Sequence, residues 1–211
     1  MALLSRKAST VALDIGSSYV KLLELERERN GKYRLKNFGI AALPPEAIVD
    51  GAFMNTTAIV STIKELLAKN KVKTKDAVVA ISGNSVIIKR ISLPVMTQDE
   101  MEESLPWEAE QYIPFDVNDV NLDAHVLQGK ADEAGQMDVL LVAARKELVN
   151  EYTSVVMEAG LRPVVIDVAA FAMENMFNLN YDNPGELVAL VNVGAGVVNL
   201  NVLRRGVSTF T

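Results

Sequence analysis

The residues with the clearest capacity for chemistry lie in a short turn near the N-terminus. Asp14 sits near the end of an apolar segment, residues 11–15, and a second β-prone segment covers residues 19–25. The turn between them consists of Gly16, Ser17 and Ser18, whose successive N–H groups can surround an anion. A hydrated divalent cation can bridge Asp14 and a phosphate, and Lys21 can add a point charge. The segment therefore predicts a hairpin for Mg-nucleotide phosphates, although the same residue types also form ordinary turns.

A second segment near the C-terminus repeats this pattern. If Asn192 is aligned with Asp14, 178 positions earlier (192 − 14), Gly194 falls on Gly16 and Asn199 falls on Lys21. An internal repeat of this kind constrains the whole fold. Two such turns facing each other would grip a phosphate chain from both sides. The predicted nucleotide-binding residues are Asp14, Gly16, Ser17, Ser18, Lys21, Asn192, Gly194, Ala195, Gly196 and Asn199; Asp14 is also the predicted metal ligand, and no catalytic residue is identified.

Composition narrows the classes of function. The 211 residues are 49% hydrophobic and include no cysteine, which excludes disulfides and thiolate chemistry. No segment approaches the ~20 apolar residues of a membrane span. The net charge is −6, and residues 94–138 hold twelve acidic residues and one lysine. We therefore expect a cytoplasmic protein that neither inserts into a membrane nor binds nucleic acid.

The elements around the repeats follow from periodicity and turn signals. A third strand over residues 33–42 follows the turn Asn30-Gly31. Asn55 or Thr56 can cap a helix that ends at Asn70, and residues 77–81 form a short buried strand. A helix that stops at Gly160, a strand over residues 163–167 and a helix over residues 169–178 then lead to the second repeat.

Residues 85–144 are predicted to form an inserted module of strand, helix, strand and strand. A strand over residues 86–93 precedes the capping-box pattern Thr97 to Glu100. Pro106 is expected to kink or split the helix that follows. Two strands, residues 121–127 and 137–143, flank a polar turn at 129–135. His125 lies within a strand, has no visible acid or nucleophile partner, and is expected to be structural or at the surface rather than catalytic.

The same module carries a candidate partner site. Trp107 and Tyr112 have the amphipathic rings that commonly anchor peptides. Val86 and Ile88 lie on a strand whose edge an extended tail can pair with. We expect these four residues to form one groove for a partner peptide. The alternative is that Trp107 is the core of the small module.

The order of the elements resembles the FtsA-type branch of the actin-like proteins, and several segments are similar to the PilM family. These segments are residues 14–18 with 21–25, 43–45 with 48–51, 107–115, 140–146, 159–161, 166–168 with 171–172, and 192–194. The resemblance implies an α/β protein with an actin-like (ribonuclease H-like) ATPase lobe. Residues 1–84 would begin lobe I, 85–144 would form an inserted α+β subdomain, 145–185 would complete lobe I, and 186–211 would begin a second lobe that is otherwise truncated.

The resemblance also implies a function. The protein would bind ATP and Mg²⁺ as a cytoplasmic scaffold of the type IV pilus assembly machine, which supports twitching motility. It would dock the N-terminal cytoplasmic peptide of PilN at the cytoplasmic face of the inner membrane, beside other platform and motor components. Asn192 and Ala169 stand where relatives often carry acids, so at most slow ATP hydrolysis is expected. Pro106 is a further departure from the family pattern, because relatives usually have a helix-forming residue at this position.

Three alternatives stay open at this point. The first is a GspL-type cytoplasmic component of type II secretion, which shares the actin-like plan. The second is a filament-forming actin-like cell-division protein, which sedimentation with ATP would reveal. The third is a sugar or acetate kinase, which needs a general base beside its substrate, and Asn192 and Ala169 weigh against it.

Overall fold

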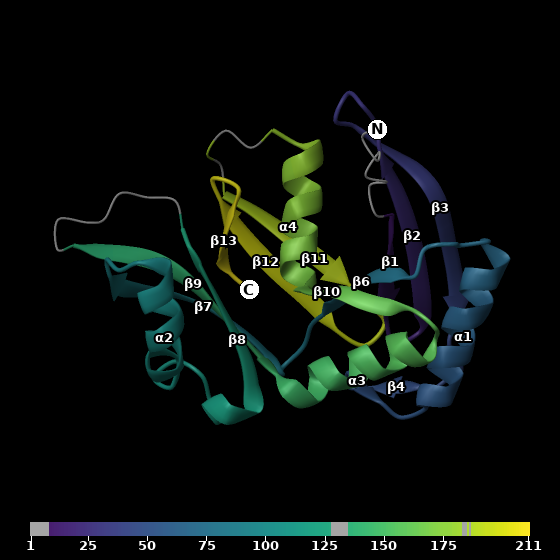
Figure 1. The fold of residues 1–211 in the computed structure, drawn as a ribbon, viewed down its shortest axis with the longest axis horizontal. Coiled ribbons are helices and arrows are strands. Elements are labelled where there is room, and N and C mark those ends of the chain that lie inside the picture. Colours follow the sequence, from purple (N-terminus) through teal and green to yellow (C-terminus); the bar gives the residue numbers. More distant parts are fainter. Residues whose placement is uncertain (1–8, 128–134, 183–184, 186) are drawn as a thin grey trace, which may run out of the picture. The chain divides into compact units, whose positions relative to one another are not determined.

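The computed structural model describes residues 9–127, 135–182, 185 and 187–211 (Figure 1). These residues form two compact units, which are described separately. The first combines the described residues up to Ile81 with Glu151–Ala169 and Val193–Val198. The second combines Ser82–Asn150, Ala170–Asn192 and Asn199–Thr211. The domain boundaries expected from the sequence remain a prediction, and most of the polar turn expected at 129–135 lies outside the described residues.

A five-stranded sheet organises the first unit. Its order is β10-β6-β1-β2-β3, with β1 (Thr10–Ile15), β2 (Tyr19–Arg27) and β3 (Tyr33–Ala42) as an antiparallel meander. Strands β6 (Asp76–Ile81) and β10 (Arg162–Val168) run parallel to β1. The N-terminal ends of these three parallel strands therefore lie at one edge, and the β1–β2 turn lies at the other.

Helix α1 (Thr56–Lys69) covers one face of this sheet. The Asn55 side chain caps it by accepting the N–H of Ala58 at 3.0 Å, as the sequence predicts. Its buried face meets β2 and β3 so closely that a Cβ at Gly39 would lie 2.4 Å from the Asn70 side-chain nitrogen. Each fully buried aliphatic residue contributes roughly 1.5–3 kcal/mol. The core here contains Val11, Leu13, Val20, Leu22, Ile59, Ile63 and Leu66. The short strands β4 (Ile48–Val49) and β5 (Ala52–Phe53) precede the helix.

Helices α1 and α3 (Lys146–Glu158) each end in a turn of the same hydrogen-bonded type. After α1, the N–H groups of Lys71 and Val72 bond to carbonyls three and five residues earlier, at 3.1 and 3.0 Å. After α3, Gly160 and Leu161 do the same at 2.9 and 3.2 Å. This Schellman turn needs a positive φ, which is 85° at Gly160 and 51° at Lys71. The first turn therefore places lysine where the backbone favours glycine.

The second unit contains a three-stranded antiparallel sheet in the order β7-β9-β8. Its strands are β7 (Val86–Pro94), β8 (Val120–Val126) and β9 (Gln136–Arg145), and the short helix η1 (Val117–Asp119) precedes β8. The predicted capping box is present at the start of α2 (Gln98–Ala109): Thr97 and Glu100 bond to each other's backbone N–H. The expectation that Pro106 splits this helix is wrong. Pro106 removes one bond close to the helix end, and the buried face of α2 continues past it.

A single apolar core joins α2 to this sheet. Its buried members are Ile91, Leu93, Met101, Leu105, Ala109, Ile113, Val120, Val139, Leu141 and Ala143. Trp107 is not among them, because 74% of its surface is exposed. The idea that Trp107 forms the core of the module is therefore wrong, and medium-sized aliphatic residues fill it instead.

The last four elements of the second unit are a helix and a three-stranded sheet, and polar side chains join the helix to the last two strands. They are α4 (Ala169–Asn180), β11 (Leu187–Val193), β12 (Val198–Arg204) and β13 (Val207–Phe210), and the strand order is β11-β12-β13. Ser208 is buried, and its hydroxyl oxygen lies within hydrogen-bond distance of both Asn201 Oδ1, at 2.9 Å, and the carboxylate of Glu174. Asn201 in turn donates to the Ala170 carbonyl at 3.0 Å. These bonds fix α4 on the β12–β13 hairpin. Among the described residues, none of the helices is long and apolar enough to cross a membrane.

Candidate functional site

The two glycine turns share one backbone geometry. The Gly16 N–H donates to the Tyr19 carbonyl at 3.0 Å, and the Gly194 N–H donates to the Val197 carbonyl at 2.9 Å. Both bonds join residues three positions apart, at positions that coincide in the sequence alignment. The internal repeat predicted from the sequence is therefore visible in the backbone. β1 and β2 flank the first turn, and β11 and β12 flank the second.

The two turns also approach each other within the first unit. A Cβ added to Gly196 would lie 3.1 Å from Ser17 Oγ and 3.7 Å from Ser17 Cβ. A Cβ at Gly194 would lie 2.8 Å from the Val197 carbonyl oxygen, closer than real Cβ atoms come. The corresponding distance at Gly16, to the Tyr19 carbonyl, is 3.3 Å. Position 194 thus excludes a side chain more strictly than position 16.

Asp14 and Lys21 form an ion pair beside the first turn. They are opposite each other in the β1–β2 register, and Lys21 Nζ lies 2.7 Å from Asp14 Oδ2. Their side chains are 63% and 51% exposed, so the pair contributes at most about 1 kcal/mol. Because the pair is weak and open to solvent, Asp14 and Lys21 can each leave the ion pair and contact a ligand instead at little cost in free energy.

Tyr152 is a neighbour of this site that sequence reasoning missed. It belongs to α3, is 7% exposed, and its ring lies 4.7 Å from that of Phe53, centroid to centroid. Burial raises the pKa of its hydroxyl to about 12, and the charges of Asp14 and Glu151 add to the effect. A neutral donor is therefore kept within electrostatic range of Asp14. The only sequence signal was the apolar face of α3, which does not distinguish this tyrosine from a core residue.

The other predicted nucleotide residues lie at the strand ends beside the two turns or in the turns themselves. Asn192 is the penultimate residue of β11, as Asp14 is of β1. Asn199 is the second residue of β12. Ala195 and Gly196 are exposed in the second turn, while Ser17 and Ser18 are half-buried in the first. The Ser18 carbonyl accepts the Leu43 N–H at 2.9 Å and so fixes the first turn to the chain after β3.

The four predicted partner residues do not form one groove. Ile91 and Leu93 of β7 face the core under α2, so the alternating residues Val86 and Ile88 lie on the opposite face of the sheet. Trp107 is exposed on α2, two positions from the buried Leu105 and Ala109. Tyr112 follows α2 and is 38% exposed. The structure therefore presents two surfaces, one on the sheet and one on the helix.

The sheet surface has a half-buried apolar centre with polar borders. Ile88 pairs with Val142 in the neighbouring strand, and Val142 pairs with Asp123. The next row runs from Arg90 through Leu140 to His125, which is exposed. β7 pairs only with β9 in this sheet, and β13 also contacts it. This face offers apolar contacts flanked by hydrogen-bonding groups.

The residues of the paired turns fit Mg-nucleotide phosphates. Anionic oxygens need N–H donors and cations, and two closely approaching glycine turns with Lys21 beside them can supply both. Mg²⁺ keeps several waters and takes one or two carboxylates beside the phosphates, so Asp14 suffices on the protein side. The bound ion would supply charge neutralisation, while the turns and Lys21 orient the phosphates.

These elements, a meander extended by parallel strands and a repeated glycine turn, define an actin-like α/β fold, and comparison with solved structures agrees. The cytoplasmic domain of EpsL, an inner membrane component of the type II secretion system of Vibrio cholerae, matches with a TM-score of 0.60 and 13% identity over 95% of this chain and 69% of that one. The ethanolamine utilization protein EutJ from Carboxydothermus hydrogenoformans matches with a TM-score of 0.52 and 15% identity, over 96% of this chain and 50% of that one.

The family is narrower than the fold. The model of the type IV pilus assembly protein PilM family matches residues 12–211, and the chain belongs to this family. A solved PilM–PilN type IV pilus biogenesis complex contains a chain that is 32% identical, with a TM-score of 0.81 over 95% of this chain. Our chain spans 60% of the length of that one. The chain thus combines the actin-like fold with membership of the type IV pilus assembly protein PilM family.

Proposed function

We propose that the protein is an ATP-binding scaffold that docks the N-terminal cytoplasmic peptide of PilN and so joins the pilus machine at the cytoplasmic face of the inner membrane. Other platform and motor components would contact it there. Membership of the PilM family favours this assignment over a GspL-type role in type II secretion.

The approach of the two glycine turns carries the nucleotide part of the proposal. Two copies of one turn, 178 residues apart in the chain (194 − 16), meet at Ser17 and Gly196. Neither turn needs the other for its own hydrogen bond, so their juxtaposition is not explained by local turn formation. A phosphate chain bound by N–H groups of both turns would explain it. Asp14 and Lys21 supply the cation contact and the compensating charge.

Calorimetric titration of Mg-ATP into the full-length protein tests this assignment. Asp14→Ala should abolish Mg-dependent binding and leave the melting temperature within a few degrees. Asp138→Ala is the matched control, because Asp138 is also a strand carboxylate in an exposed ion pair, with Arg90 Nη2 at 2.5 Å. Unchanged ATP affinity in Asp14→Ala, or an equal loss in both variants, would contradict the phosphate assignment.

The second part of the proposal is that ATP acts as a ligand with slow turnover. Asn192 and Ala169 bring no carboxylate to the positions where relatives often have one, and general-base assistance is typically worth 10²–10⁴-fold. We expect turnover far below the ~10 s⁻¹ of a median enzyme. A steady-state phosphate-release assay on the full-length protein measures it directly.

PilN docking is assigned to the sheet surface of the second unit. Support comes from the apolar row Ile88–Val142 between polar borders and from the position of β7 at the edge of its sheet. An extended peptide can add to such an edge and place alternate side chains on the apolar face. The solved relative, whose chain is in complex with PilN, supports the choice of partner.

A peptide titration separates the two candidate surfaces. The PilN N-terminal peptide is titrated against wild type, Ile88→Glu on the sheet and Trp107→Ala on the helix, with circular dichroism to check the fold. We expect Ile88→Glu to abolish binding and Trp107→Ala to retain it. Loss in Trp107→Ala alone would move the docking site to α2, and wild-type binding in both variants would exclude both surfaces.

A further inference from the structure

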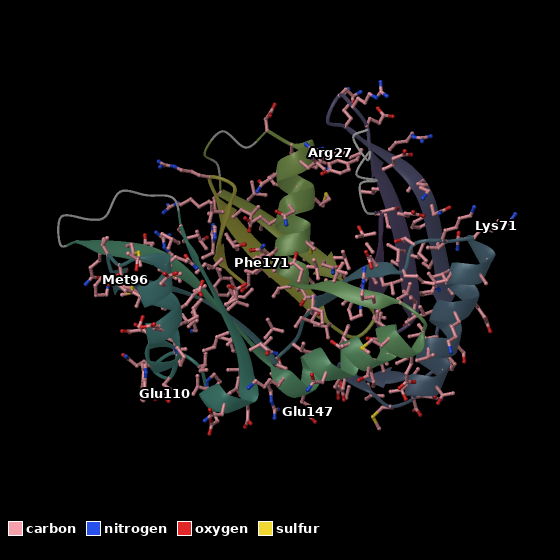
Figure 2. The ribbon with its side chains drawn as sticks, in the orientation of Figure 1. Arg27, Lys71, Met96, Glu110, Glu147 and Phe171 are labelled. Atoms are coloured by element: carbon pink, nitrogen blue, oxygen red, sulfur yellow. The ribbon has the colours of Figure 1, made fainter. Side chains whose placement is uncertain are left out.

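One edge of the five-stranded sheet in the first unit gathers basic residues from two separate loops. Lys69 ends α1, and Lys71, Lys73 and Lys75 follow it in the loop to β6. Arg27 ends β2, and Arg29 and Lys32 follow it in the loop to β3. Topology places both loops at the same end of the sheet, because β6 begins at the end where β2 ends and β3 begins. β6 and β2 flank β1, so their strands are separated by about 10 Å. Lys71 and Arg27 mark the two loops in Figure 2. We call these seven residues the basic edge.

The basic edge is exposed and largely uncompensated. In the α1–β6 loop, Lys71, Lys73 and Lys75 are exposed while the alternate residues Val72 and Thr74 are half-buried, so the three lysines point to the solvent side. Nearby acids already have partners: Glu26 and Glu28 pair with Arg34, and Asp76 pairs with Arg162 at 2.6 Å. Glu158, at the end of α3, is exposed. No ion pair involves any of the seven cations within the part of the chain that the structure describes.

The backbone gives a second reason to assign a role to these charges. Lys71 has a φ of 51° at the position of a Schellman turn where α3 has Gly160. A residue with a Cβ is strained in this conformation, whereas glycine is not. A lysine near a helix C-terminus does interact favourably with the helix dipole, but Lys69 already supplies that interaction for α1. The lysine at position 71 is therefore held against the local preference of the chain.

We propose that the basic edge binds the anionic headgroups of a lipid bilayer. Lysines are point charges on flexible stems, which suit a diffuse layer of headgroups rather than bidentate recognition of single phosphates. Each lysine or arginine near such a surface adds roughly fivefold to the affinity, and the effect decays within a Debye length. The chain as a whole carries −6, so attraction is confined to this edge. A type IV pilus assembly component that meets the inner membrane through a partner would gain a second, weaker contact. This inference goes beyond the proposed function and needs neither nucleotide nor PilN.

Vesicle sedimentation tests the basic edge. The protein is incubated without nucleotide or PilN with vesicles of phosphatidylcholine, or of phosphatidylcholine and phosphatidylglycerol, at low and high salt. We expect binding to the anionic vesicles only, suppressed by salt. Lys71→Glu/Lys73→Glu should weaken binding by about 30-fold or more. The matched control is Arg204→Glu/Arg205→Glu, which reverses two exposed cations of the second unit outside β7, and it should bind as wild type does.

Three results would overturn the proposal. The first is wild-type protein that does not sediment with anionic vesicles. The second is an equal loss in both double variants, which would indicate a nonspecific effect of net charge. The third is tighter binding of duplex DNA than of anionic vesicles at equal phosphate concentration, which would assign the basic edge to nucleic acid. Circular dichroism of both variants excludes misfolding, and PilN peptide binding, unaffected in both, separates this test from that of the proposed function.

Discussion

Alanine substitutions in the two glycine turns should have unequal effects on nucleotide affinity, although the turns are repeats. At Gly194 the new Cβ would lie 2.8 Å from the Val197 carbonyl oxygen, the same oxygen that accepts the Gly194 N–H at 2.9 Å. The Val197 oxygen belongs to the backbone and cannot move aside as a flexible side chain would, so the turn must open to admit the Cβ. At Gly16 the corresponding distance is 3.3 Å, and a shift of a few tenths of an ångström relieves it.

The expected magnitudes follow from the bonds that each change disturbs. Opening the second turn removes its own bond, worth about 1 kcal/mol, and displaces N–H donors from a charged phosphate, each worth roughly 1.5–3 kcal/mol. Loss of one such donor weakens binding about 10- to 150-fold. A small shift at Gly16 keeps its donors in range, and we expect a loss of no more than about threefold. The unfolding free energy should fall by about 1 kcal/mol in Gly194→Ala.

Calorimetry with Mg-ATP on the full-length protein and its two variants measures this ratio. Urea unfolding of the same samples shows whether the fold is retained. A greater loss in Gly16→Ala than in Gly194→Ala would refute the reasoning from close contacts. Full affinity in both variants would refute the role of the paired turns in phosphate binding.

Three further outcomes are expected. Burial raises the pKa of Tyr152 in the folded protein to about 12, above the usual 10. The tyrosine therefore ionises first in the unfolded chain, so its contribution to the unfolding free energy is complete below pH 10 and is lost, by roughly 2–3 kcal/mol, as the pH approaches 12. Urea unfolding at alkaline pH should show this loss in wild type, and Tyr152→Phe should abolish it. Burial raises the pKa of Glu24, but hydrogen bonds from Lys36, Ser9 and Asn37 outweigh it and lower the pKa below the usual 4.5, so the stabilisation is present above pH 4.5 and is lost as the pH falls through the folded value; Glu24→Gln should show a flatter acid profile. Lys71→Gly should raise the unfolding free energy by about 0.5 kcal/mol and weaken binding to anionic vesicles about fivefold, so a stabilised variant that binds vesicles like wild type would separate the two effects.

Local patterns were sufficient to predict most elements of the fold. Strand β3 has the predicted bounds, Asn55 caps α1, and the Thr97 capping box is formed. Each depends on neighbouring residues, whose preferences the sequence states directly. The glycine turns were also visible, because a repeated Gly spacing is a signal that survives without structural context.

What the sequence could not predict depends on distant packing. Trp107 was expected to join Val86 in one groove, but the phase of α2 exposes it and the alternation of β7 turns Val86 to the other face. Glu24 looked like an ordinary strand residue, yet it is fully buried and accepts bonds from Ser9 and Asn37, both at 2.6 Å. Neither outcome is determined by residues nearby in the chain, so no local pattern reveals it.

The contact between Ser17 and Gly196 can form only late in the synthesis of the chain. The two residues are 179 positions apart (196 − 17), and a ribosome adds about 5–20 residues per second, so the second turn emerges roughly 10–40 s after the first. The β1–β2–β3 meander can form from local pairings during that interval, because its strands are adjacent in the chain. Under the proposed assignment, nucleotide would not guide those early steps, since half of the proposed site would not yet be translated. If ATP assists the folding of this protein, it does so only late, by binding to a sheet that has already folded.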